Sequence, residues 1–143
     1  MVSLIFVILT NDCTPSVDSI EIEIMQALNE LGEARVEENV QKVLTHYTDP
    51  FSQIEEGNTE FFPLDEYSLL LEGLFSSIDY LFNIFNNETI TILDSNNAIV
   101  ECDEHYKIEE GESIEESIER EKITLVKVEG EIINKIMRKG LIS

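Results

Sequence analysis

One carboxylate stands out among the residues of this sequence that are able to do chemistry. Glu104 lies between Cys102 and Tyr106 on a face of an alternating segment that is otherwise apolar. Burial raises the pKa of an unpaired carboxyl, so an enclosed Glu104 is expected to titrate above its ordinary value of about 4.3. Such a group is a candidate proton shuttle. The alternatives are a slipped register, a bulge, or a strand end that is already in solvent.

The other reactive residue types form no recognised site pattern. His46 and His105 are far apart in the sequence, and no closely spaced set of ligands accompanies either of them. Cys13 and Cys102 form no metal-ligand pair, and the acidic stretch 109–116 lacks the spacing of an EF-hand loop. The sequence therefore predicts no metal centre and no cofactor. We interpret His105 as a surface residue and His46 as a helix-terminal one.

The strongly acidic composition limits the classes of partner. The 143 residues carry a formal net charge of −21, and only Arg35 and Lys42 among the basic residues precede Lys107. A surface of this charge repels phosphate backbones, so we expect no nucleic-acid partner, and it disfavours anionic membranes. The apolar stretches are too short to span a bilayer. Solubility and suppressed self-association are the simplest effects of the charge.

The first part of the chain, 1–17, is an apolar segment in front of a single predicted domain, 18–143. A short apolar run from Leu4 to Leu9 precedes Cys13. It resembles the end of a secretory or lipoprotein signal, but the positively charged start of such a signal is missing. We interpret the segment as the remainder of a signal that begins upstream, as a segment that packs on the domain or a partner subunit, or as an untidy terminus. A cytoplasmic protein is favoured, with export or lipid anchoring as the alternative.

Changes in periodicity define the elements that must position these residues. Apolar residues recur at helical spacing from Asp18, which suits a helix cap, to Leu31. The range Gly32–Arg35 interrupts the pattern, and a second stripe from Val36 to Tyr47 is out of register with the first. We therefore predict two helices, or one helix that is sharply kinked at this interruption.

The second half of the chain changes from helical to strand periodicity. Pro50 ends the second helical stripe, and Pro63 begins a third predicted helix that reaches Phe75. From Ile78 onward apolar and polar residues alternate, which is typical of strands. The remaining expected features are an extended segment at 51–56, a hairpin turn at 94–97, an acidic loop at 109–116, and final strands at 118–128 and 132–138.

Three stretches of sequence carry a resemblance to a known family. They are ALNELGEARVEENVQKVLTHYTDPF at 27–51, PLDEYSLLLEGLF at 63–75 and ITLVKVEGEI at 123–132. Together with the spacing between them they cover nearly everything after residue 18. This arrangement resembles the SnoaL-like and ketosteroid-isomerase-like branch of the nuclear-transport-factor-two superfamily. The resemblance implies an α+β, cystatin-like cone, in which three N-terminal helices pack against a strongly bent antiparallel sheet and leave a pocket at the open end.

The resemblance also implies where a catalytic group would lie. In the isomerases of this superfamily a carboxylate just beyond the second helix moves the proton, and that position falls on Glu55, next to Glu56. The tyrosine that binds the oxyanion falls near Leu31, and the acid that assists it falls near Ile123. An oxyanion hole of that design is therefore absent, and its loss costs orders of magnitude in rate. Glu55 and Glu104 are the two candidate catalytic residues.

The predicted pocket lies between the concave sheet face and the helices, with Glu104 and Glu55 as its polar groups. Its expected apolar lining consists of Leu44, Tyr47, Phe62, Tyr67, Leu71, Tyr80, Val100 and Tyr106. Apolar walls with a few convergent polar groups are typical of small-molecule sites. The sequence thus favours a domain that binds a small apolar molecule. The alternative is an enzyme of the isomerase, cyclase or dehydratase type that uses one of these carboxylates as a proton shuttle.

The last predicted strands carry apolar residues on both faces. Ile123 and Leu125 lie on one side, and Val126 and Val128 on the other, with further apolar residues beyond Ile132. A sheet with only one buried face alternates more cleanly, and large exposed apolar patches mark interfaces. We therefore predict a homodimer through the outer face of the sheet.

Overall fold

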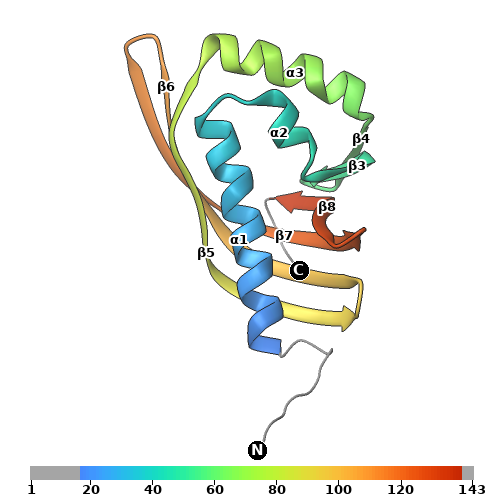
Figure 1. Ribbon diagram of the computed structural model, residues 1–143. Coiled ribbons are helices and arrows are strands. Elements are labelled where there is room, and N and C mark those ends of the chain that lie inside the picture. The colour runs from blue at the N-terminus through green and yellow to red at the C-terminus, as the bar shows by residue number, and fades with distance from the viewer. Residues whose placement is uncertain (1–16, 140–143) are drawn as a thin grey trace, which may run out of the picture.

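Helices come first and strands last in the computed structural model, which describes residues 17–139 (Figure 1). In chain order the elements are α1 (Val17–Val36), α2 (Val40–Leu44), β3 (Tyr47–Glu55), β4 (Asn58–Phe62), α3 (Leu64–Ser77), β5 (Asp79–Asp94), β6 (Asn97–Glu110), β7 (Ser113–Val128) and β8 (Glu131–Lys139). The predicted α+β class is confirmed. Apart from Val17, the predicted apolar segment 1–17 lies outside the described residues.

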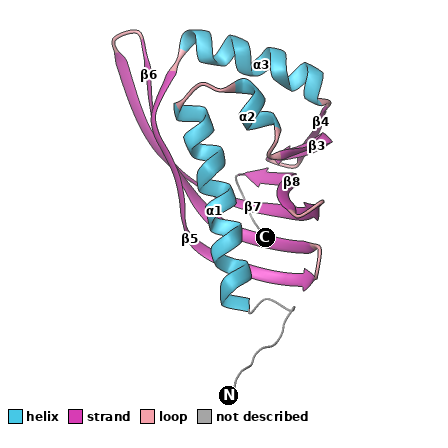
Figure 2. Cartoon of the chain, viewed as in Figure 1, coloured by secondary structure: helices cyan, strands magenta, loops and turns pink. Residues whose placement is uncertain are grey.

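A six-stranded sheet in the order β4-β3-β8-β7-β6-β5 curves around the helices (Figure 2). We call the face toward α1 the concave face and the opposite face the convex face. Neighbouring strands are antiparallel except β3 and β8, which are parallel. The bent sheet is therefore antiparallel as predicted, except that the β3–β8 pair makes it mixed. Turn residues indicate which consecutive strands pair. β3 and β8 are far apart in the sequence and meet only in the assembled fold, so no local pattern predicts their pairing.

The two predicted helices are present as α1 and α2, but α1 continues without a break through Gly32, so the boundary between them lies at 37–39 and not at Gly32–Arg35. Gly32 is buried against β5, and a Cβ at this position would lie 2.0 Å from the backbone oxygen of Asn83. Glycine is required here for the close approach of the helix to the strand. It marks tight packing, and not a kink.

The second helix is shorter than the apolar stripe suggested. Asn39 caps α2, and its side chain accepts a hydrogen bond of 3.1 Å from a backbone N–H of the first turn. The helix ends at Leu44, and Tyr47 already begins β3. Pro50 lies inside β3 instead of ending a helix. The pairing of β3 with β8 is irregular between Tyr47 and Ser52, which is where a strand tolerates the missing N–H of proline.

The predicted hairpin at 94–97 is confirmed, since it joins β5 to β6. The predicted acidic loop at 109–116 is instead the end of a second hairpin. β6 continues to Glu110, β7 begins at Ser113, and Gly111 adopts a φ of 60° in the turn between them. The exposed strand residues of this arm include three glutamates, Glu110, Glu115 and Glu116. Their charge therefore indicates solvent-exposed positions and does not indicate that the strands end there.

An irregularity in β5 changes which of its residues face the helices. The pairing with β6 shifts register between Tyr80 and Phe82. As a result Asn83 and Phe85 are buried, whereas Ile84, predicted to lie on the same side as Tyr80, is 42% exposed. A bulge of this kind adds one residue to one strand and inverts the alternation beyond it.

The hydrophobic core lies between α1 and the concave face, and an aromatic cluster extends it toward α3. Phe51 lies at the centre of this cluster, with ring centroids 4.4 Å from Tyr47, 4.7 Å from Tyr67 and 5.2 Å from Phe62. Across 17–139, the helices are all too short or too polar to cross a membrane.

Candidate functional site

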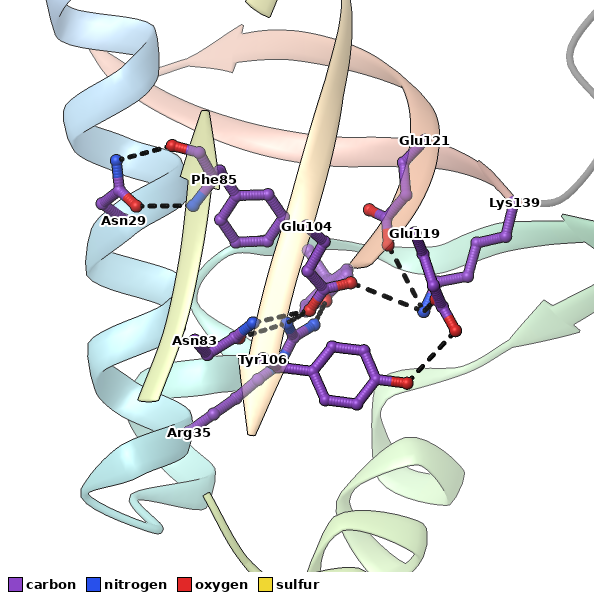
Figure 3. A network of polar contacts seen from close by, with 10 residues as sticks. Asn29, Arg35, Asn83, Phe85, Glu104, Tyr106, Glu119, Glu121 and Lys139 are labelled. Carbon is purple, nitrogen blue, oxygen red and sulfur yellow. Dashed lines mark hydrogen bonds and ion pairs between the residues drawn. The ribbon is translucent and has the colours of Figure 1, made fainter. Parts of the chain in front are cut away.

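Glu104 is buried on the concave face of β6, with 3% of its surface exposed. Arg35, near the end of α1, donates from Nη1 to Oε2 of Glu104 and to Oδ1 of Asn83, both at 2.8 Å. Asn83 on β5 donates from Nδ2 to the same carboxylate oxygen, also at 2.8 Å. Figure 3 shows these three side chains converging from three different elements. The carboxylate that the alternation placed on an apolar face is therefore paired.

Arg35 is fixed by contacts on both of its terminal nitrogens. Its Nη2 donates to the hydroxyl of Tyr47 at 2.8 Å, and only 7% of the residue is exposed. Asn29, further back on α1, accepts a hydrogen bond of 2.9 Å from the backbone N–H of Phe85 (Figure 3). This contact fixes the position of α1 along β5, and so the position along the sheet at which Arg35 contacts it.

A second cation lies on the other side of Glu104. The Nζ of Lys139, at the end of β8, is 3.7 Å from Glu104, 3.6 Å from Glu119 and 3.5 Å from Glu121. Glu119 and Glu121 alternate along β7, opposite Glu104 and Lys139 respectively. We call Arg35, Glu104, Glu119, Glu121 and Lys139 the charge cluster.

The charge cluster runs from the protein interior to its surface. Glu121 is fully buried, whereas the side chain of Lys139 is 24% exposed and that of Glu119 is 39% exposed. Tyr106, half-buried on β6, donates from its hydroxyl to Glu119 at 3.1 Å. The solvent-facing end of the cluster therefore carries a tyrosine, a carboxylate and an ammonium group.

The pKa of Glu104 is shifted in the direction opposite to the prediction. Burial would raise the pKa of this carboxyl, but Arg35 and the hydrogen bonds and positive charge around it lower the pKa to about 2. The expectation of a raised pKa is wrong because it assumed an unpaired group. The raised pKa belongs instead to Glu121, where burial acts first and the neighbouring Glu104 carboxylate adds to it.

Several polar atoms of the charge cluster have no hydrogen-bond partner among the described residues. They are Oε1 of Glu104, Oε1 of Glu119, and both carboxylate oxygens of Glu121. These three carboxylates place one oxygen each within 4.8 Å of one another, and they are the set within 17–139 whose spacing suits a metal ion. The ammonium of Lys139 lies beside all three, so a cation is already supplied by the chain itself.

The structure does not bring Glu55 to the charge cluster. It lies exposed at the end of β3, and Glu56 follows in the turn. The two histidines are also elsewhere. His105 lies on the convex face as predicted, with Nε2 2.6 Å from a carboxylate oxygen of Glu116, and burial lowers the pKa of the half-buried His46.

The eight residues expected to line a pocket fall into three groups. Tyr47, Leu71 and Val100 are buried in the hydrophobic core, and Leu44, Phe62, Tyr67 and Tyr80 pack against it. Tyr106 is half-buried beside the charge cluster, with its ring centroid 6.2 Å from that of Tyr80. Tyr80 and Tyr106 are thus the members of the set that lie together at the polar end of the concave face.

Three surface cavities lie away from these residues. A cavity of about 890 Å³ follows the outer side of α1 near Glu88, and one of about 650 Å³ lies beside the hairpin turns at 94–97 and 129–130. The third, of about 520 Å³, lies beside His46. None of these three is lined by a residue of the predicted pocket.

Sequence reasoning missed four of the five members of the charge cluster, although signals for three of them were present. Arg35 follows Leu28 and Leu31 on the buried side of α1, and a single cation on an apolar helical stripe needs a partner. Glu119 and Glu121 alternate in phase with the buried Ile123. Lys139 lay beyond the predicted end of the last strand.

Comparison with known proteins identifies the fold but no closer relative. No family model matches the sequence, and no curated protein matches it. A ketosteroid isomerase-like protein from Erwinia carotovora atroseptica has a TM-score of 0.68 at 15% identity, covering 85% of this chain and 95% of that one. The fold is cystatin-like, as it is in solved proteins described as nuclear-transport-factor-two-like.

Two further solved structures are consistent with this fold. A cystatin-like protein of unknown function from Nostoc punctiforme has a TM-score of 0.63 at 12% identity, over 87% of this chain and 91% of that one. The calcium/calmodulin-dependent kinase II hub homology domain of Chlamydomonas reinhardtii has a TM-score of 0.69 at 16% identity, over 87% and 100%. The predicted resemblance is therefore confirmed at the level of the fold, which by itself does not decide function.

Proposed function

We propose that this domain binds a small, largely apolar molecule on the concave face of the sheet. The observation that carries the proposal is the meeting of half-buried aromatic rings with polar groups at one place. Tyr80 and Tyr106 lie side by side, and Glu119 and Lys139 present partly exposed charges next to them. Apolar walls with a few convergent polar groups are the usual composition of a small-molecule site.

Binding is favoured over catalysis by the state of the two candidate carboxylates. An efficient general base has a pKa near the working pH. The pKa of Glu104 is lowered to about 2, and its Oε2 is already occupied by Arg35 and Asn83, so it is a poor base at neutral pH. Glu55 lies in solvent outside the charge cluster. Neither residue supports an isomerase, cyclase or dehydratase function.

The experiment is a fluorescence titration with Nile red, a neutral apolar dye. Ser117 pairs with Tyr106 across β6 and β7 and is half-buried, so Ser117→Trp places an indole on the proposed binding face. The adjacent Ile118 is exposed on the convex face, and Ile118→Trp is the matched control. We expect the dye to bind the wild-type protein and Ile118→Trp, and to lose affinity for Ser117→Trp. Equal binding to both variants would refute a site on the concave face.

We further propose that the chain forms a homodimer through the convex face. Val126, Ile133 and Ile136 are half-buried on late strands whose concave side is already filled by the core. Basic residues of this acidic chain, such as Lys122 and Arg120, also lie on the late strands, which reduces repulsion between two copies there.

Sedimentation at micromolar concentration tests the dimer. Thr124 alternates with the buried Ile123 and Leu125 and lies near the centre of the convex face, so Thr124→Glu places two added charges in the proposed interface. We expect a dimer for the wild-type protein and a monomer for this variant. Gln26→Glu, on the outer side of α1, adds the same charge elsewhere and should leave the dimer intact. A wild-type monomer would contradict the proposal.

A further inference from the structure

The charge cluster contains more negative than positive groups. Its two cations, Arg35 and Lys139, are in contact with three carboxylates, so one carboxylate is in excess. Glu119 is partly exposed and can be solvated, whereas Glu104 and Glu121 are 3% and 0% exposed. Arg35 pairs with Glu104. Lys139, the nearest cation to Glu121, is shared with the other two carboxylates. A buried carboxylate that only shares its cation is unfavourable as an ion, and such a group takes up a proton instead.

The contact between Glu104 and Glu121 indicates where such a proton would lie. The two side chains are within hydrogen-bonding reach of each other. As two carboxylates they have no hydrogen to share, and Oε1 of Glu104 and both oxygens of Glu121 are then without hydrogen-bond partners among the described residues. One proton removes the excess charge and also turns this contact into an O–H···O hydrogen bond.

We propose that Glu104 and Glu121 form a proton-binding site, and that Glu121 carries its proton in the folded protein at neutral pH. Glu121 is the holder because Arg35 and Asn83 both donate at 2.8 Å to Glu104, which keeps Glu104 ionised. Within 17–139 no group donates a hydrogen bond to Glu121, and its nearest cation is the Lys139 ammonium at 3.5 Å. The directions of the two pKa shifts, down for Glu104 and up for Glu121, agree with this assignment.

Among the described residues, the groups around Glu121 offer no further positive charge. Cys102 lies opposite it on β6, and burial raises the pKa of that thiol to about 12, so it is neutral. The other titratable or charged side chains facing this region are Arg35 from α1, Tyr47 from β3, Tyr80 from β5, Glu104 and Tyr106 from β6, Glu119 from β7 and Lys139 from β8. A divalent ion would have to displace Lys139, whereas a proton requires no additional space.

The proton makes the folding equilibrium depend on pH in a defined direction. Between the ordinary glutamate pKa of about 4.3 and the raised pKa of Glu121, the folded protein binds one more proton than the unfolded chain. Stability contributed by this site therefore falls as pH rises through that window. For one proton, the unfolding equilibrium constant rises by up to about tenfold per pH unit.

The test compares the wild-type protein with Glu121→Gln in guanidinium unfolding between pH 5 and pH 8. Glutamine keeps the shape of a protonated glutamate and an N–H group to donate to Glu104. We expect the ratio of the wild-type to the variant unfolding constant to rise with pH, by up to about tenfold per unit. Glu115→Gln makes the same substitution at an exposed position of the same strand, so it is the matched control and should give a flat ratio.

Three outcomes would overturn the proposal. A ratio for Glu121→Gln as flat as that of the control would mean that Glu121 is ionised in the folded state. Infrared spectra of the folded wild-type protein at pH 7 that lack the carbonyl band of a protonated carboxyl would do the same, and they do not require the variant to fold. Stabilisation by added Ca²⁺ that disappears in Glu121→Gln would assign the site to a metal ion.

Discussion

Replacing Gly32 by alanine sets two effects of opposite sign against each other. Gly32 lies in the interior of α1, where alanine normally stabilises a helix by about 0.5–1 kcal/mol relative to glycine. A Cβ at this position would lie 2.0 Å from the backbone oxygen of Asn83 and 3.0 Å from its carbonyl carbon. A backbone carbonyl within a sheet does not rotate away as a flexible side chain does, so α1 or β5 must move.

The size of this movement decides whether Gly32→Ala stabilises or destabilises the protein. Carbon and oxygen atoms approach one another to about 3.3–3.6 Å, so the helix and strand must separate by more than about 1 Å. Arg35 lies one turn further along α1, and its hydrogen bonds to Asn83 and Glu104 are each 2.8 Å long. Overpacking costs about 1–3 kcal/mol, and a weakened buried ion pair adds to it. We expect Gly32→Ala to lower the free energy of unfolding by about 2–4 kcal/mol.

Gly73 supplies the matched control. It lies in α3, and a Cβ there would meet no atom within 4 Å, so Gly73→Ala should stabilise by about 0.5–1 kcal/mol. Guanidinium unfolding followed by circular dichroism measures both variants, and equal denaturant slopes confirm that the unfolded states are comparable. A Gly32→Ala variant as stable as the wild-type protein would refute the close approach of α1 to β5.

Three further predictions concern the contacts that position Glu104. Tyr47→Phe leaves Nη2 of Arg35 unpaired and should cost about 1–3 kcal/mol in urea unfolding. Asn29→Ala removes the acceptor of the Phe85 N–H, and its cost of about 1 kcal/mol should appear as faster amide exchange at Phe85. Because the pKa of Glu104 is lowered to about 2, its contribution to stability is present above about pH 4.3 and is lost as pH falls toward 2. Acid unfolding of Glu104→Gln should be correspondingly less steep between these values.

Local patterns were sufficient to predict the hairpin at 94–97 and the burial of Glu104. Alternation along β6 placed Glu104 in phase with Val100 and Cys102, and all three are buried. The turn residues at 94–97 joined two strands as predicted. These features depend on residues close in sequence, where side-chain direction follows from the period of the element.

The direction of the pKa shift of Glu104 was mispredicted because it depends on a distant residue. Arg35 is 69 positions away in the sequence, and nothing in the alternation of β6 indicates that α1 crosses the strand at this height. Burial and pairing act on a carboxyl in opposite directions. A sequence pattern that reports burial alone therefore cannot give the direction of the shift.

Asn83 and Gly32 show a second limit of sequence reasoning. The register shift after Tyr80 moves Asn83 to the concave face, although the uninterrupted alternation placed it opposite Tyr80. Gly32 looked like a helix breaker, but it is the point at which the helix touches the backbone of Asn83. Both errors have one origin, because the contact between α1 and β5 is tertiary.

The charge cluster connects the first described helix to the last described strand, since Arg35 lies on α1 and Lys139 on β8. Buried ion pairs add little net stability compared with well-packed apolar residues, so stability alone does not account for them. Register does. Glu119 and Glu121 share the concave face with Ile123, and a slip of one residue in β7 would move them to the convex face and leave Lys139 with Glu104 alone. The same slip would expose Ile123, so the hydrophobic pattern and the charge cluster specify one pairing of these strands together.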